Sequence, residues 1–185
     1  MNGFDEVALL LLIVVPLFGA VAMMFMPGDE SEQTWYFAIF IAAISLALSL
    51  VIFVNYDYNL GGFQLSNTYE WLPGPLDINL SLGIDGISAP MVLLNGIVLL
   101  GGVLVSQTVK YRTREFFVLL FALSAGVYGV FVARDLFFLF FFYELAVLPM
   151  YLLIGVWGSS TDFGTFLRTK EYGAMKILIY LVAGS

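Results

Sequence analysis

The sequence predicts an all-α membrane protein: a polytopic bundle of five full transmembrane helices and an incomplete sixth. It also predicts an extramembrane β-hairpin between helices two and three. Three observations predict this class. Of 185 residues, 61% are hydrophobic and only 11% are charged, whereas soluble domains have about 45–50% apolar and about 25% charged residues. The mean hydropathy is +0.97. Apolar stretches long enough to cross a bilayer recur along the chain.

A hydrocarbon core of ~30 Å requires about 20 apolar residues in a helix. Five stretches meet this length, at residues 8–26, 36–54, 87–109, 116–133 and 136–157. A sixth begins near Glu171 and is still apolar at Ser185. At ~1.5 Å per residue it is too short for a full crossing, so we expect the natural subunit to be longer. The whole range 1–185 is expected to form a single membrane domain.

The segment 55–86 differs from the helices, because apolar and polar residues alternate on both sides of Pro73-Gly74-Pro75. The apolar positions are Phe63, Leu65, Tyr69 and Trp71 before the turn, and Leu76, Ile78, Leu80 and Leu82 after it. Period-two alternation on both sides of a turn is typical of a β-hairpin. An extended loop is the alternative.

The basic residues predict the orientation in a cell (inner) membrane. Helices alternate in direction, so the loops 27–35, 110–115 and 158–170 share one face. That face has Lys110, Arg112, Arg114, Arg168 and Lys170, and the opposite face has only Arg134. Under the positive-inside rule the basic face is cytoplasmic. We therefore expect the N-terminus and the segment 55–86 on the outer face.

The absence of cysteine and histidine excludes several kinds of site from this chain. Disulfides, thiolate zinc sites, iron–sulfur ligation and histidine-ligated haem all require these residues. We therefore expect no cofactor in this chain. The sequence also has no basic patch suited to nucleic acid and no glycine motif for a nucleotide.

Two ionisable residues lie inside predicted spans, Glu144 and Lys176. A charge at the bilayer centre costs about 2.5–3.5 kcal/mol on insertion scales, and such residues mark ion or proton paths. Glu144 lies near mid-membrane, five residues before Pro149, which cannot donate to the Leu145 carbonyl. We interpret it as a proton relay; a structural, hydrogen-bonded glutamate is the alternative.

Lys176 lies only about five residues into its helix, so its stem could reach the cytoplasmic surface. However, Tyr172, Lys176 and Tyr180 recur at helical spacing and form one stripe. The sequence leaves relay and anchor open. We estimate that the depths of Lys176 and Glu144 differ by about 10 Å, which disfavours a direct ion pair.

Small residues form one face of the fourth helix, namely Ala122, Gly126, Gly129 and Ala133. In lipid such faces allow close helix contact, and we interpret this face as tight packing. Asp85 and Asp135 precede helices three and five, where we expect helix caps.

Several motifs resemble the antiporter-like membrane subunits of complex I. The segment Leu82-Gly83-Ile84-Asp85-Gly86-Ile87-Ser88 is similar to the motif before their third helix. More specific are Tyr143-Glu144-Leu145, the segments 148–154 and 157–158, and Lys176-Ile177-Leu178-Ile179-Tyr180. Together they resemble the NuoM type, chain 4 of NADH:quinone oxidoreductase, of which this chain would be an N-terminal fragment.

The resemblance implies a fourteen-helix subunit with two inverted repeats, which couples quinone reduction to proton translocation. It implies other complex I membrane subunits as partners, with the redox cofactors and the quinone site on partner subunits. The family's fifth-helix glutamate, which pairs with a seventh-helix lysine, matches Glu144. Lys176 matches a sixth-helix lysine found in part of the family. The chain would then be a non-redox subunit of an oxidoreductase.

Homologous subunits of sodium/proton antiporters and membrane-bound hydrogenases are the main alternative, and a purely structural scaffold is another. The sequence leaves open the electron donor (NADH, ferredoxin or F420H2), the quinone and whether the ion is H⁺ or Na⁺.

Overall fold

The computed structural model describes residues 3–26, 31–72, 78–162 and 167–184. These residues form six α-helices: α1 (Gly3–Met24), α2 (Ser31–Asn55), α3 (Ser88–Val105), α4 (Thr113–Val132), α5 (Leu136–Trp157) and α6 (Lys170–Gly184). The first five are long and apolar enough to cross a membrane. The predicted fold class, a polytopic helix bundle with a hairpin after the second helix, is therefore confirmed. A 3₁₀ turn at Ser106–Thr108 follows α3, where the sequence predicted continued helix.

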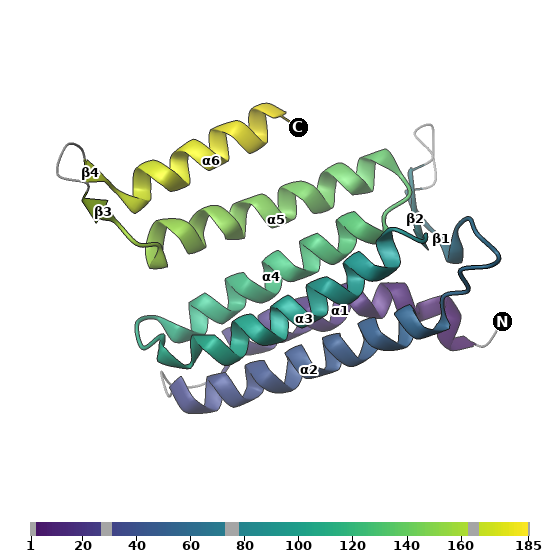
Figure 1. The fold of residues 1–185 in the computed structure, drawn as a ribbon, viewed down its shortest axis with the longest axis horizontal. Helices are drawn as coiled ribbons and strands as arrows, with labels where there is room; N and C mark the ends of the chain where they lie inside the picture. Colours follow the sequence, from purple (N-terminus) through teal and green to yellow (C-terminus); the bar gives the residue numbers. More distant parts are fainter. Residues whose placement is uncertain (1–2, 27–30, 73–77, 163–166, 185) are drawn as a thin grey trace.

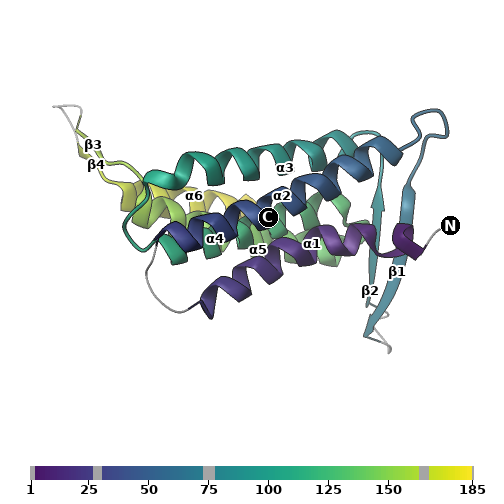
Figure 2. The ribbon, with the colours of Figure 1, turned by 90° about the horizontal axis from the view of Figure 1, so that it is seen from below.

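The helices lie side by side, with α5 next to α4 and α6 next to α5 at one edge (Figure 1). Seen from below, the hairpin covers the end where α1 begins, whereas β3 (Thr161–Asp162) and β4 (Leu167–Arg168) lie at the opposite end (Figure 2). The segment between α3 and α4 is at this second end too. The basic segments 110–115 and 167–170 therefore share one end, as alternating helices require, and Arg134 lies at the other.

The hairpin consists of β1 (Gln64–Leu72) and β2 (Ile78–Ile84), paired antiparallel with Tyr69 opposite Leu80. This confirms the hairpin, and the extended loop is wrong. The predicted Pro/Gly turn lies outside the described residues. Leu80, Leu82 and Ile84 of β2 are buried, because alternate side chains of a strand point to one face. In β2 the face with these three side chains packs against the ends of α1 and α4.

The hairpin also holds the corner between α4 and α5. Leu82 forms an isolated bridge with Ala133, and the Arg134 N–H donates to the Ser81 carbonyl at 2.9 Å. The Arg134 guanidinium lies 4.5 Å from the centre of the Phe63 ring. Arg134 therefore contacts the hairpin through both its backbone and its side chain. This corner determines where α5 begins.

Both predicted capping aspartates accept backbone hydrogen bonds. Asp135 accepts from the N–H of Phe137 at 2.8 Å and of Phe138 at 3.4 Å, which begins α5. Asp85 accepts from the N–H of Ser88 at 2.7 Å and from its hydroxyl at 2.8 Å, one turn before α3. The hydrogen bonds from the Ser88 backbone and hydroxyl hold the pKa of Asp85 below its ordinary value, because they stabilise the carboxylate.

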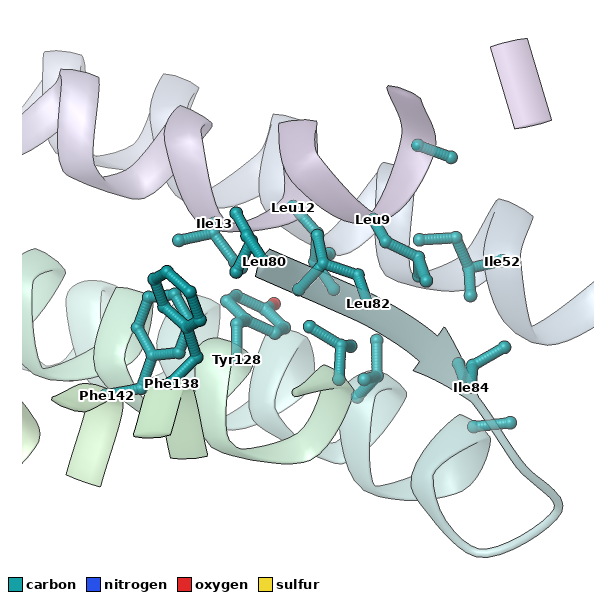
Figure 3. Packing of buried hydrophobic residues seen from close by; sticks show 14 of the residues in the cluster. Leu9, Leu12, Ile13, Ile52, Leu80, Leu82, Ile84, Tyr128, Phe138 and Phe142 are labelled. Carbon is teal, nitrogen blue, oxygen red and sulfur yellow. The ribbon is translucent and has the colours of Figure 1, made fainter. Parts of the chain in front are cut away.

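Side chains from α1, the hairpin, α4 and α5 meet in one cluster (Figure 3). Its labelled members include Leu12 and Ile13 of α1, Leu82 of β2, Tyr128 of α4 and Phe142 of α5. A second cluster, with Met23, Leu99 and Phe121 among its members, lies nearer the basic end. In lipid these contacts stabilise through close van der Waals packing rather than through removal of water.

Candidate functional site

Glu144 lies eight residues after the start of α5 and is half-buried. Its neighbours two residues away on either side, Phe142 and Ala146, both contact α4. A Cβ on Gly129 would collide with the Phe142 ring, and a Cβ on Gly126 would lie 2.8 Å from the Ala146 nitrogen. Two residues correspond to about 200° around a helix. Glu144 therefore points away from α4.

The small-residue face predicted on the fourth helix is thus the surface on which α5 packs. The two glycines allow the α5 backbone to approach α4 closely, as small residues do in membranes. Phe138 and Phe142 are buried in this contact, whereas Phe137, Phe140 and Phe141 are exposed. This packing turns the opposite side of α5, with Glu144, away from α4.

Helix α6 covers a neighbouring side of α5. The Tyr143 hydroxyl donates to the Leu181 carbonyl at 3.4 Å, and the Tyr151 hydroxyl donates to the Met175 sulfur at 3.5 Å. These two contacts define an antiparallel register in which Glu144 is level with residues 180–181 and Lys176 with Pro149. Five residues of helix separate the two levels, which corresponds to about 7 Å along the axis. The value is close to the depth difference estimated from sequence.

Pro149 lies on α5 at the level of Lys176. Because proline has no N–H, the carbonyl of Leu145 receives no hydrogen bond from the residue four positions later. That carbonyl belongs to the residue next to Glu144. A polar backbone atom is therefore placed on the stretch of α5 that runs from the level of Glu144 to the level of Lys176.

Lys176 is exposed on α6, six residues after the helix begins. Its Nζ lies 5.9 Å from the ring centre of Tyr172 and 5.9 Å from that of Tyr180. Both distances are within the range of cation–π attraction. The predicted stripe therefore forms and holds the ammonium group between two rings. This geometry is compatible with both the relay and the anchor.

A buried polar cluster, which the sequence did not predict, connects α2, α3 and α4. Ser49 and Tyr128 share a hydrogen bond of 2.9 Å, and the Ser49 hydroxyl also donates to the Ser45 carbonyl at 2.8 Å. Nearby, the Asn95 amide donates to the Ser124 hydroxyl at 3.2 Å. The sequence contained two signals of this cluster. One is the spacing of four residues between Ser45 and Ser49, and the other is the polar Asn95 within an apolar helix. Serine can bond its own helix, so those signals did not specify partners.

Within the described ranges, no group of three or more acidic, histidine or cysteine side chains could hold a metal ion.

The chain is similar to curated membrane subunits from cyanobacteria. It is 34% identical over 175 residues to "NAD(P)H-quinone oxidoreductase chain 4-2" of Synechocystis sp. and 35% identical over 176 residues to "NAD(P)H-quinone oxidoreductase chain 4 2" of Trichodesmium erythraeum. Each alignment covers 94% of this chain and 30% of the relative. A homologue from Thermosynechococcus vestitus is 34% identical, covering 96% of this chain and 32% of its own length. The chain thus spans about 30% of the length of these relatives. No protein-family model matches it.

Proposed function

Since this chain is a homologue of the chain 4 subunits of NAD(P)H-quinone oxidoreductase along nearly its whole length, we propose that it is part of a proton-translocating membrane subunit. In this proposal, quinone reduction on partner subunits is coupled to proton transfer across the membrane, and this chain contributes no redox site. Its partners are the other membrane subunits of the same complex. The similarity to chain 4 subunits is the observation that supports the proposal.

Glu144 is the proposed proton relay. Its carboxyl is half-buried in the middle of a span, on the side of α5 that points away from α4. A carboxyl in such a place can take up a proton from one side and release it to the other when its surroundings change. The resemblance to the family adds a seventh-helix lysine as its charge partner.

Lys176 is proposed as a secondary group in the same path. It lies about 7 Å from the level of Glu144 along the helix axis, and the Leu145 carbonyl lies between the two levels. Tyr172 and Tyr180 hold its ammonium group at the surface of α6.

We further propose that residues 1–185 form one membrane domain, with the N-terminus and the segment 55–86 on the outer face and the basic end in the cytoplasm. Single cysteines test this orientation without background, because the chain has no cysteine. An impermeant thiol reagent added to intact cells should label Asn59→Cys and should miss Tyr111→Cys, which lies outside the spans at the basic end. Both side chains are exposed, so accessibility does not bias the comparison. The reverse pattern would contradict the orientation. Thr113 is unsuitable, since its hydroxyl is buried and bonds to Val109.

The coupling function is tested in inverted membrane vesicles from cells that lack this chain. We expect proton uptake driven by NADH, NADPH or reduced ferredoxin to be lost, and a plasmid copy to restore it. Uptake driven by ATP hydrolysis should be unchanged and serves as the control. Intact quinone-linked uptake combined with loss of sodium/proton exchange would instead identify an antiporter subunit. Intact uptake combined with loss of hydrogenase activity would identify a hydrogenase subunit.

A further inference from the structure

A cationic cavity at the basic end of the bundle opens beside an apolar groove. We propose that together they bind one anionic phospholipid of the surrounding membrane, with its phosphate at Lys110, Arg112 and Arg114 and an acyl chain in the groove. This site is separate from Glu144 and does not depend on the proposed function.

The cavity has a volume of about 350 Å³ and is lined by Thr34 of α2 and the segment 110–115. Three of its side chains are cationic and one, Glu115, is anionic, so the lining has an excess of positive charge. Basic pockets between membrane helices are suited to anionic headgroups, and each basic residue near the surface contributes about 1 kcal/mol to attraction.

The groove has a volume of about 440 Å³ and shares Arg112, Arg114 and Glu115 with the cavity. Its remaining lining is almost entirely apolar: Met24 of α1, Val118 and Leu119 of α4, and Leu152, Val156 and Trp157 of α5. The charged lining therefore continues directly into an apolar surface along α4 and α5. A soluble anion would use only the first part, whereas a phospholipid matches both.

Neighbouring groups fix the positions of two arginines of the cavity, Arg114 and Arg112. Arg114 donates from Nη1 to the Met26 carbonyl at 3.1 Å, which fixes the guanidinium between α4 and the end of α1 and leaves further N–H groups. Arg112 is paired with Glu115, and both side chains remain about half exposed, at 51% and 44%. The hydrogen bond and charge of Glu115 raise the pKa of Arg112, so its positive charge is retained.

Aromatic side chains place this cavity at the level of the lipid headgroups. The Trp157 indole donates to the Tyr111 carbonyl at 2.9 Å, and the Trp35 indole donates to the Val103 carbonyl at 3.0 Å. Tryptophan and tyrosine concentrate at membrane–water interfaces. The phosphate of a lipid in the bilayer would therefore lie at the depth of Arg112 and Arg114, and its acyl chain would extend toward Leu119 and Leu152.

Photolabelling of the detergent-purified complex tests the proposal. The probe is phosphatidylglycerol with a photoreactive group on one acyl chain, and the matched probe is the zwitterionic phosphatidylcholine analogue. We expect the anionic probe to label peptides that contain residues 118–119 and 152–157. Unlabelled phosphatidylglycerol should compete, whereas inorganic phosphate should not.

Charge variants complete the test. Lys110→Gln with Arg112→Gln should weaken labelling about twenty-five-fold, since each basic residue corresponds to about fivefold. Glu115→Gln should strengthen it about fivefold by the same reasoning, and it reports independently if the double variant is poorly assembled. Arg134→Gln removes the same charge at the opposite end and should have no effect. Equal labelling by both lipids, displacement by phosphate, unchanged labelling in the variants, or crosslinks to another protein in the groove would overturn the proposal.

Discussion

Replacement of Glu144 by glutamine is expected to abolish proton pumping while the assembled complex stays in the membrane. Glutamine keeps the shape of the side chain and can still form hydrogen bonds, but it cannot release a proton. Because Glu144 points away from the contact with α4, the substitution should leave the packing of α5 intact. General acid–base groups commonly contribute about 10²–10⁴-fold, so we expect pumping to fall at least about a hundredfold and coupled quinone reduction to fall strongly.

Two further variants separate the relay from a structural function. Glu144→Asp keeps a carboxyl shortened by one methylene and should retain part of the pumping. Glu171→Gln removes an exposed carboxyl at the start of α6 and should behave as the natural protein. The measurement is the number of protons taken up by inverted vesicles for each quinone reduced, together with the amount of assembled complex. Full pumping by an assembled Gln variant would leave Glu144 with a structural function only.

Alanine at Gly126 should destabilise the helix bundle, although alanine is normally the better helix former by about 1 kcal/mol. Its Cβ would lie 2.8 Å from the backbone nitrogen of Ala146 and 2.9 Å from its Cβ. A backbone atom cannot move aside as a flexible side chain can, so α5 must shift. Overpacking of this kind costs about 1–3 kcal/mol. Alanine at Gly129 meets the buried ring of Phe142 and should have a similar effect.

Gly101 provides the matched control, because a Cβ there would meet no atom within 4 Å. Gly101→Ala should leave the stability unchanged or raise it slightly. The measurement is the midpoint of unfolding by sodium dodecyl sulfate in mixed micelles, followed by tryptophan fluorescence, and the level of the subunit in membranes. If Gly126→Ala and Gly101→Ala unfold at the same midpoint, close contact between α4 and α5 is not required for stability.

The hydrophobic pattern alone was sufficient to predict the membrane class, the helices and the hairpin. The bilayer requires long apolar helices whose backbone groups are paired internally, so spans can be read from composition. The range 136–157 predicted for the fifth helix agrees with α5, because Asp135 caps its start and Gly158 follows its end. Other ends moved by a few residues. At Ser31 the helix begins in a polar stretch, where hydropathy carries no signal.

Glu144 and Lys176 could be selected from sequence for the same reason, since an ionisable residue is conspicuous in an apolar span. The surroundings of these two residues could not be predicted from the sequence. Helical periodicity describes which residues share a face, but the partner of that face depends on contacts between segments far apart in the chain. The contact of Gly126 and Gly129 with α5, which turns Glu144 away from α4, is decided by packing. The same holds for the hydrogen bond between Ser49 and Tyr128 and for the joined cavity and groove at Arg112 and Arg114. Close packing and hydrogen bonding between helices act only once the helices are together, so these features belong to the tertiary structure.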